Sequence, residues 1–509
     1  MLLIEKDLRG SFSKDRFCHQ FVLGSAFVDA LQGWQRVPVD ESFKLTVHPE
    51  IAVEQVSDAT RSITVIGQIF DPRTPGADNA GVARALFDVF SSVERLMAAT
   101  AVCGGRWIII AYDAERKAMF TDALGLRQVF YTTGECSRGF WVASQPGLLG
   151  WLFELRVDAT AEKFIDSLEF RRHREYRWPG TATPFREIVR LLPNHYLDLC
   201  TGQCHRYWPG RALQEEGFDE AIEKAAGLLQ GMMRAVHARF DVVIGMTAGF
   251  DSRIVLAASS AIRKGVAGVT VRQGGMPDNH QDIAVAARVL GKAGISREVI
   301  KALPYMSAEF SKAFKQNVFL AHDHYGQDVE AILHRFGRTK VVVTGSGAEV
   351  VREPFRKKID AEKREITARD LATLQSMGEC EFAVDSFQRW LGGIGERYNI
   401  HLLDLFSWEQ SHGNWLAATQ MEFDLAWRDM FTPFNCRELL TTMLSIDARY
   451  RSSPRHRAFY ALIEKMWPDL LDEPINPDKS EGRGSLRKTG RSVKNAIKSR
   501  LVRRGIKKR

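Results

Sequence analysis

Short apolar segments separated by turn residues dominate the first third of the chain. Their length and their β-branched and aromatic content predict strands. Residues 82–98 instead have the spacing of an amphipathic helix, with Ala85, Leu86, Val89 and Phe90 on one face. We therefore predict a β-rich stretch from residue 1 to about 155, within a first domain that we place over residues 1–210. The strands expected in it include 62–70, 105–111 and 140–144.

From residue 211 onward, strand-length runs of valine and isoleucine alternate with longer helical patterns. This alternation predicts an α/β domain with a doubly wound parallel sheet, which we place over residues 211–475. Ligands of such sheets bind at the carboxyl ends of the strands. The expected strands are 241–245, 268–271 and 340–343, and the expected helices are 218–240, 254–260 and 282–290.

The segment that follows the first of these strands carries candidate chemistry. It reads Met246-Thr247-Ala248-Gly249-Phe250-Asp251-Ser252 and leads into a helix. A glycine turn at a helix N-terminus presents N–H groups and positive potential to an anion, and Thr247 and Ser252 add hydroxyl donors. Asp251 would repel a phosphate unless a divalent cation lay between them, so the segment indicates a nucleotide triphosphate with Mg²⁺. The alternative is an ordinary strand–turn–helix with a capping side chain.

A second glycine-rich segment repeats the arrangement. The valine strand at 340–343 runs into Thr344-Gly345-Ser346-Gly347-Ala348-Glu349, which again combines backbone donors with a carboxylate. Its alternative is a glycine-rich turn with a surface glutamate. Neither segment is a Walker A loop, because no Gly-Lys-Ser/Thr follows a four-residue spacer. Farther along, His412 lies in an aromatic helical region and is expected to be a core or groove residue.

Composition narrows the cellular context. The 509 residues are 45% hydrophobic, which suits two or three domains. No apolar run reaches the ~18 residues of a membrane span, and the charged residues after Met1 do not resemble a signal peptide. The seven cysteines are scattered and odd in number, so we expect free thiols, without zinc or disulfides, in the cytoplasm.

The positive charge is concentrated at the end of the chain. Residues 478–509 contain thirteen Lys or Arg and two acidic residues, a net +11, which leaves −3 for the rest of a chain whose formal charge is +8. A basic tail over 476–509 suits an anionic surface or an acidic partner. The alternative is a disordered, solubilising tail.

The motifs together resemble the asparagine synthetase family. The first loop resembles the family's Ser-Gly-Gly-x-Asp-Ser pyrophosphatase loop, with Ala248 in place of the first glycine, and the second resembles its Ser-Gly-Asp/Glu-Gly-Ala/Ser-Asp-Glu segment. The N-terminal domain is similar to the family's glutaminase domain in the order of its pieces. These include residues 122–131, matching Arg-Asp-x-x-Gly-x-x-Pro-Leu-Tyr-Tyr, 192–196, matching Leu-Pro-x-Gly-His, and 206–208, matching Arg-Tyr-Trp.

The resemblance implies a fold for each domain. It implies an αββα Ntn-hydrolase-like domain followed by an ATP-pyrophosphatase domain of the adenine nucleotide α-hydrolase type. The family's nucleophile is a cysteine directly after the initiator Met, whose α-amine acts as base; here that position is Leu2, and the family's Asn-Gly-Glu is Ile66-Gly67-Gln68. Cys18 lies too far along to offer an N-terminal amine. The first domain is therefore expected to be degenerate and not to hydrolyse glutamine.

The resemblance further implies ATP-dependent adenylation of a carboxylate, with attack by an amine and release of AMP and pyrophosphate. By position, Mg²⁺ would be held by Asp251 and Glu349. Ser346 stands where asparagine synthetases carry an acid, so the substrate would be a small-molecule or peptide carboxylate other than aspartate. Arg455 or Arg457 falls near the family's pyrophosphate-binding lysine. The expected catalytic residues are Asp251, Ser252, Ser346, Glu349 and Arg457, and the expected ATP-binding residues are Met246, Thr247, Ala248, Gly249, Phe250, Asp251, Ser252, Val271, Arg272, Thr344 and Gly345.

Two other classes of function stay open at this point. One is a non-catalytic relative that binds a nucleotide and acts as a scaffold, favoured by Ala248, Ser346 and Phe431, which depart from the family's motifs. The other is a different ATP pyrophosphatase, such as a nucleic-acid-modifying enzyme, to which the basic tail would be relevant. A homodimer is among the expected assemblies.

Overall fold

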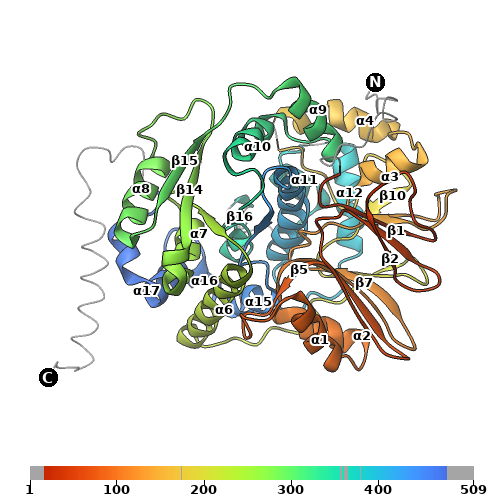
Figure 1. The fold of residues 1–509 in the computed structure, drawn as a ribbon, viewed down its shortest axis with the longest axis horizontal. Helices are drawn as coiled ribbons and strands as arrows, with labels where there is room; N and C mark the ends of the chain where they lie inside the picture. The colour runs from red at the N-terminus through yellow and green to blue at the C-terminus, as the bar shows by residue number, and fades with distance from the viewer. Residues whose placement is uncertain (1–16, 173–174, 356–357, 360–364, 379, 478–509) are drawn as a thin grey trace.

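The computed structural model describes residues 17–172, 175–355, 358–359, 365–378 and 380–477. Leu2 and nearly all of the basic tail predicted over 476–509 lie outside these residues. Two antiparallel sheets form the N-terminal part and one parallel sheet forms the C-terminal part (Figure 1). Among the described residues, no helix combines the length and the apolar character that a membrane span needs.

The N-terminal domain has four layers. Two six-stranded antiparallel sheets pack face to face, and helices cover their outer surfaces. Ile66 and Ile108 face the other sheet, whereas their neighbours Val65 and Ile109 face the helices, as the two-residue period of a strand requires. This is the αββα arrangement that the resemblance implied. The first sheet contains β1 (Phe21–Gly24), β2 (Gln35–Pro38), β3 (Lys44–Val47), β8 (Phe130–Thr132), β9 (Val142–Ala143) and β10 (Ile188–Arg190), and the second contains β4 (Val53–Ser57), β5 (Ser62–Phe70), β6 (Gly104–Tyr112), β7 (Lys117–Thr121), β11 (His195–Asp198) and β12 (Cys204–Arg206).

The helix predicted over 82–98 is wrong as a single element. It is two helices, α1 (Asn79–Asp88) and α2 (Val93–Ala99), and Val89, which was placed on the buried face, is 54% exposed. Ser92 causes the break, because its hydroxyl accepts a hydrogen bond from the N–H of Arg95 and caps a new helix. The other outer layer includes α3 (Pro146–Phe153), and α4 (Ala159–Asp166) packs with the helical region of the second domain.

The C-terminal domain contains a five-stranded sheet in the order β15-β14-β13-β16-β17, with every pair parallel. Helices cover both faces, so the predicted doubly wound sheet is confirmed. The strands are β13 (Val242–Gly245), β14 (Val266–Arg272), β15 (Arg297–Lys301), β16 (Val341–Val343) and β17 (Asp429–Phe431). One face carries α6 (Phe218–Arg239), α7 (Phe250–Ala258), α8 (Gln281–Ala293), α15 (Arg437–Ser445) and α17 (Arg457–Met466), and the other carries α9 (Ala308–Asn317), α10 (Asp323–Phe336) and α14 (Ala417–Phe423).

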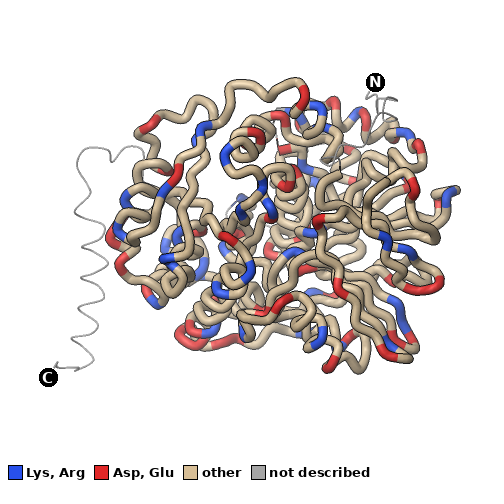
Figure 2. The backbone as a smooth tube through the Cα atoms, viewed as in Figure 1, with Lys and Arg blue, Asp and Glu red and all other residues tan. Residues whose placement is uncertain are grey.

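A further helical region lies between the second glycine loop and the last strand. Its elements are α11 (Ala368–Leu374), α12 (Glu381–Gly392), α13 (Leu402–Phe406) and a π-helix over Ser407–Leu416; α16 (Ala448–Arg451) follows β17 and α15. The π-helix is ten residues long, and such elements are frequent at functional sites. Acidic and basic residues are interspersed along the described chain (Figure 2), in keeping with a body whose net charge is small.

Candidate functional site

The two glycine-rich loops meet at one edge of the parallel sheet. β13 and β16 are adjacent and parallel, so the loops that follow them leave from the same edge. A Cβ atom on Gly345 would lie 2.3 Å from the carbonyl carbon of Asp251. Only glycine therefore lets the second loop come this close to the start of α7. The sequence predicted each loop separately, and the sheet order brings them into contact.

Hydrogen bonds within the first loop shape it. The hydroxyl of Ser252 accepts from the N–H of Thr247 at 3.2 Å and lies 3.1 Å from the Thr247 hydroxyl, which accepts from the N–H of Gly249 at 3.2 Å. The N–H of Ala248 donates to the Asp282 carboxylate at 2.8 Å. Ala248 is not among the residues with positive φ, so alanine fits at this position.

α7 begins four residues earlier than predicted, at Phe250. Asp251 and Ser252 therefore lie in its first turn, where the helix dipole favours negative charge. Gly249 is the N-cap, and no side chain of the described residues caps the helix. The first turn thus presents its N–H groups at the same edge as the second loop.

Asp251 and Glu349, predicted as the metal ligands, belong to one cluster of four side chains. The guanidinium of Arg352 lies between the two carboxylates, 2.8 Å from Asp251 and 3.4 Å from Glu349. On the other side, Nε2 of His412 lies 3.4 Å from Glu349. Nδ1 of His412 donates to the carbonyl of Ser407 at 2.9 Å, within the π-helix, and this bond turns Nε2 toward Glu349.

The two carboxyl groups titrate in opposite directions. Burial raises the pKa of Asp251 to about 7, against the effect of Arg352 and with a contribution from the charge of Glu349. The hydrogen bond to His412, and then the charges of His412 and Arg352, lower the pKa of Glu349 to about 2 despite burial. Such divergent values for neighbouring acids are typical of functional sites, although ion-pair networks also produce them.

One oxygen of Asp251 suits a cation. Oδ2 binds Arg352, whereas Oδ1 is buried and has no hydrogen-bond partner in the structure. A buried carboxylate oxygen without a donor is costly, and a hard divalent cation would satisfy it. Asp251 and Glu349 therefore fit Mg²⁺ as a pair of carboxylates on facing loops.

The remaining predicted residues on the loops and strands make contacts of their own. Thr344 donates its N–H to Phe431 at 2.9 Å and its hydroxyl to Ser346 at 3.2 Å. Met246 is buried, and its carbonyl accepts from the Thr270 hydroxyl at 2.9 Å. Val271 lies near the end of the adjacent strand β14.

Arg272 and Arg457 contact neither Asp251 nor Glu349. Arg272 donates to the carbonyl of Met276 at 2.7 Å and lines a cavity of about 180 Å³ with residues 273–277, Lys301 and Ala302. The guanidinium of Arg457 lies over the rings of Phe218 and Tyr450, with 4.5 and 4.9 Å to the ring centroids. The cation that contacts Asp251 is instead Arg352.

A C-terminal segment lies against the first loop. Arg253, fully buried, donates to the carbonyls of Leu470, Glu473 and Pro474 at 2.7, 3.1 and 3.0 Å. The N–H of Asn476 then donates to the carbonyl of Ala248 at 3.0 Å. The loop is thus bordered by a segment more than two hundred residues away in sequence.

Sequence reasoning missed Arg352, Asp282 and Asn476 and placed His412 in the core or a groove. Arg352 follows Glu349 by one helical turn, a spacing that could have suggested an ion pair. The other three contacts depend on packing between distant segments, so no local signal was present.

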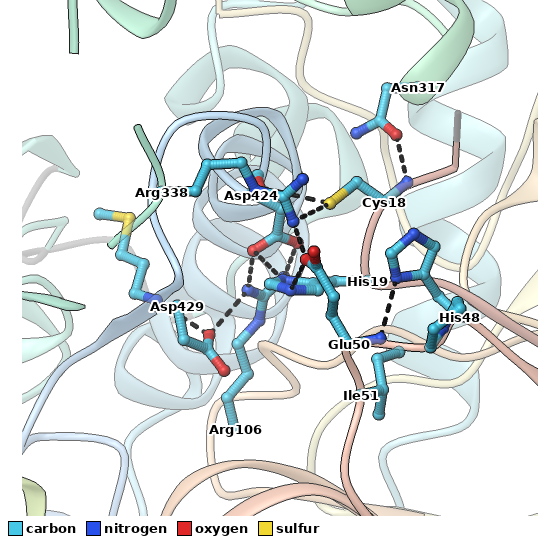
Figure 3. A network of polar contacts seen from close by, with 12 residues as sticks. Cys18, His19, His48, Glu50, Ile51, Arg106, Asn317, Arg338, Asp424 and Asp429 are labelled. Atoms are coloured by element: carbon cyan, nitrogen blue, oxygen red, sulfur yellow. Dashed lines mark hydrogen bonds and ion pairs between the residues drawn. The ribbon is translucent and has the colours of Figure 1, made fainter. Parts of the chain in front are cut away.

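A second polar cluster joins the two domains (Figure 3). Arg106 on β6 makes two hydrogen bonds to Asp424, at 2.5 and 2.8 Å, and all of these atoms are buried. Cys18 lies three residues before β1, and its sulfur, a ring nitrogen of His48 and an oxygen of Glu50 lie within 4.8 Å of one another. Arg338 donates to both Cys18, at 2.8 Å, and Glu50, so its guanidinium occupies the space that a metal ion on these three ligands would need.

Comparison with known proteins finds no match in sequence and only weak likenesses to solved structures. No family model matches the sequence, and no curated protein matches it. Similar solved structures include the NH3-dependent NAD synthetase of Campylobacter jejuni subsp. jejuni NCTC 11168 (15% identity, 27% of this chain and 60% of that chain, TM-score 0.19). Another is the glutamine-dependent NAD+ synthetase of Acinetobacter baumannii in complex with ADP (17% identity, 32% of this chain and 31% of that chain, TM-score 0.19).

A third is the glutamine phosphoribosylpyrophosphate amidotransferase of B. subtilis, complexed with ADP and GMP (12% identity, 77% of this chain and 90% of that chain, TM-score 0.23). The chain spans less than two thirds of either NAD synthetase. All of these TM-scores are low, so the likenesses indicate nothing about activity.

Proposed function

We propose that this protein is an ATP-dependent ligase that adenylates a carboxylate and joins it to an amine. The observation that supports the proposal is the meeting of two glycine loops, each with its carboxylate, at the carboxyl edge of a parallel sheet. The first turn of α7 offers backbone donors for phosphate, and the hydroxyls of Thr247 and Ser252 lie beside it.

The reaction has two steps. A carboxylate oxygen of the substrate bonds to the α-phosphorus of ATP, and the bond from that phosphorus to the β-phosphate oxygen breaks, releasing pyrophosphate. The amine nitrogen then bonds to the acyl carbon, loses a proton, and AMP leaves with the acyl oxygen. The amine is free or carried by a second substrate, because Ile66-Gly67-Gln68 stands where the family's glutaminase domain has Asn-Gly-Glu.

Negative charge on the departing pyrophosphate is what the site must stabilise. Asp251 and Glu349 would hold Mg²⁺, which supplies charge neutralisation for the phosphates. Arg352 lies between these carboxylates, so its guanidinium is placed to move from them to a phosphate oxygen. Ser346 lies beside Thr344 on the second loop, where a substrate group could reach it. Arg457 has no part in this assignment.

Pyrophosphate release tests the proposal directly. Purified protein with ATP, Mg²⁺ and a panel of carboxylates should release pyrophosphate with at least one of them, and calorimetry should show Mg²⁺-dependent ATP binding. Asp251→Asn should lose both, whereas Asp241→Asn, an exposed aspartate immediately before β13, should keep them. Failure of the wild-type protein to bind ATP, with or without carboxylates, would refute the proposal.

A second candidate is a nucleotide-binding scaffold without catalysis. The observation that favours it is the arrangement of the free site: Arg352 already neutralises both carboxylates, and the Thr247 and Ser252 hydroxyls bind each other. A scaffold should bind ATP equally well with and without Mg²⁺ and release no pyrophosphate with any carboxylate. The same two measurements therefore separate the candidates.

A further inference from the structure

A cavity of about 40 Å³ lies where three parts of the chain converge. Its walls come from the first antiparallel sheet, from the segment 176–190, and from the second domain, at the loop before α10 and at α14. None of Asp251, Glu349, Arg352 and His412 lines it. The cavity is therefore separate from the site described above, and the inference does not depend on the proposed ligase activity.

Arg190, the last residue of β10, is a buried cation that pairs with no acidic side chain among the described residues. It is 5% exposed, and within the described part of the chain its guanidinium makes one hydrogen bond, from Nη1 to the carbonyl of Gly413 at 3.3 Å. The ring of Phe130 lies 4.8 Å from the guanidinium carbon, and Nε has no partner. Burial alone lowers the pKa of Arg190 to about 9. A buried guanidinium with so few partners is costly unless an anion accompanies it.

Two more residues of the lining carry an unpaired donor. Nε2 of Gln128 and Nε2 of His322 are buried and have no hydrogen-bond partner in the structure. Nδ1 of His322 binds Glu422 at 2.6 Å, and the ring of Tyr176 stacks on His322 at 5.1 Å. Burial opposes charge on His322, but its hydrogen bond to Glu422 raises the pKa overall.

The charge of Arg190 is the one that this lining leaves unbalanced. The second oxygen of Glu422 also lacks a partner, yet its carboxyl group is already paired with His322. Among the fully buried side-chain atoms of the described lining, the unpaired ones are thus three donors, from Gln128, Arg190 and His322, and one acceptor, from Glu422. This set suits a ligand that accepts hydrogen bonds and carries one negative charge.

We propose that the cavity beside Arg190 binds a small carboxylate. Its volume corresponds to about three water-sized groups, which excludes a nucleotide and admits an anion of the size of formate or acetate. One carboxylate can accept from Arg190 and from Gln128 at the same time, with His322 beside them, and charge-assisted bonds such as the one from Arg190 are the strong ones. Occupancy would satisfy donors that the folded chain leaves unpaired.

Acetate is the probe for the test. The full chain is exchanged into a buffer whose anion is gluconate, which is too large for the cavity, and is titrated with sodium acetate, acetamide or more sodium gluconate at constant ionic strength. Calorimetry gives the Kd and thermal unfolding gives the Tm. Acetate should bind saturably and raise the Tm by about 2 °C or more, whereas acetamide and gluconate should not.

Substitutions test whether acetate binds in the cavity beside Arg190. Arg190→Met should abolish acetate binding, and Gln128→Leu should weaken it about three- to tenfold, the loss of one hydrogen bond. Arg186→Met, an exposed residue of the same segment paired with Glu135 at 2.8 Å, should leave the Kd unchanged. If Arg190→Met does not fold, Gln128→Leu decides the matter alone.

Three outcomes would overturn the proposal. Equal shifts from acetate, acetamide and gluconate would mean that water fills the cavity and the response is a general solute effect. Acetate binding that survives in folded Arg190→Met would place the anion elsewhere. An unchanged acetate Kd in Gln128→Leu would do the same.

Discussion

Replacing Asp251 with Asn should stabilise the protein at neutral pH while removing its activity. The carboxyl group has an ordinary pKa of 3.8 and a pKa of about 7 in the folded protein, chiefly because of burial. The difference corresponds to roughly 4 kcal/mol against the charged form. Because the side chain is 25% exposed, solvent screening reduces the expected gain to about 1–2 kcal/mol.

The sign follows from proton linkage. The folded protein keeps the Asp251 proton up to about pH 7, whereas the unfolded chain loses it near pH 4, so this group favours the folded state at low pH and that stability is lost as the pH rises through 7. The free energy of unfolding of Asp251→Asn should equal that of the wild type below pH 4. Between pH 4 and 7 the free energy of unfolding of the variant should exceed that of the wild type by a growing amount, and it should stay higher above pH 7.

Urea unfolding at pH 4, 5.5, 7 and 8.5 measures this difference, with pyrophosphate release measured on the same samples. Asp241→Asn is the matched control, since it removes an exposed carboxylate next to the same strand and should show no such pH-dependent gain. A variant less stable than the wild type at pH 8.5 would show that the Arg352 ion pair outweighs burial. That result would refute the reasoning about Asp251.

Three further variants test how the site is held together. Gly345→Ala should cost about 1–3 kcal/mol in urea unfolding and impair ATP binding, because its Cβ would lie 2.3 Å from the carbonyl carbon of Asp251. Arg106→Met should cost about 3–5 kcal/mol by the same assay, because it leaves the buried Asp424 with His19, at 3.4 Å, in place of its bidentate arginine partner. Arg253→Met should raise hydrogen exchange of the 470–476 segment at least tenfold, because three hydrogen bonds to its carbonyls are lost.

Each of these variants has a control in the chain. Gly274→Ala should be nearly neutral, because a Cβ there meets nothing within 4 Å. Replacing Arg106 and Asp424 together by apolar residues should recover much of the stability lost in the single variant. Arg263→Met, which removes a cation over the Trp467 ring at 5.7 Å, should leave exchange of the segment unchanged. An unaffected Gly345→Ala protein would show that the two loops do not pack as described.

The outcome for individual segments shows where sequence reasoning is strong. The strand 62–70 matches β5 residue for residue, and the helix 218–240 matches α6 to within one residue. Both sequence patterns are long and periodic, so the element that they predict does not depend on how it packs. The helix 82–98 failed because a serine cap, worth about 1 kcal/mol, ends one helix and starts another within the same apolar pattern.

The sequence by itself determined the strands of the first domain, the doubly wound layers of the second, the two glycine loops and the carboxylate on each, whereas the αββα layering came from the family resemblance. These features are local, because strand and helix periods, turn glycines and charged residues are written in consecutive positions. Tertiary structure decided which groups meet them: Arg352 contacts Asp251 across 101 residues, and His412 contacts Glu349 across 63. It also decided that Arg190 is buried and pairs with no carboxylate among the described residues. Which side chains contact each other depends on which segments pack together, and the packing of the whole hydrophobic core determines that.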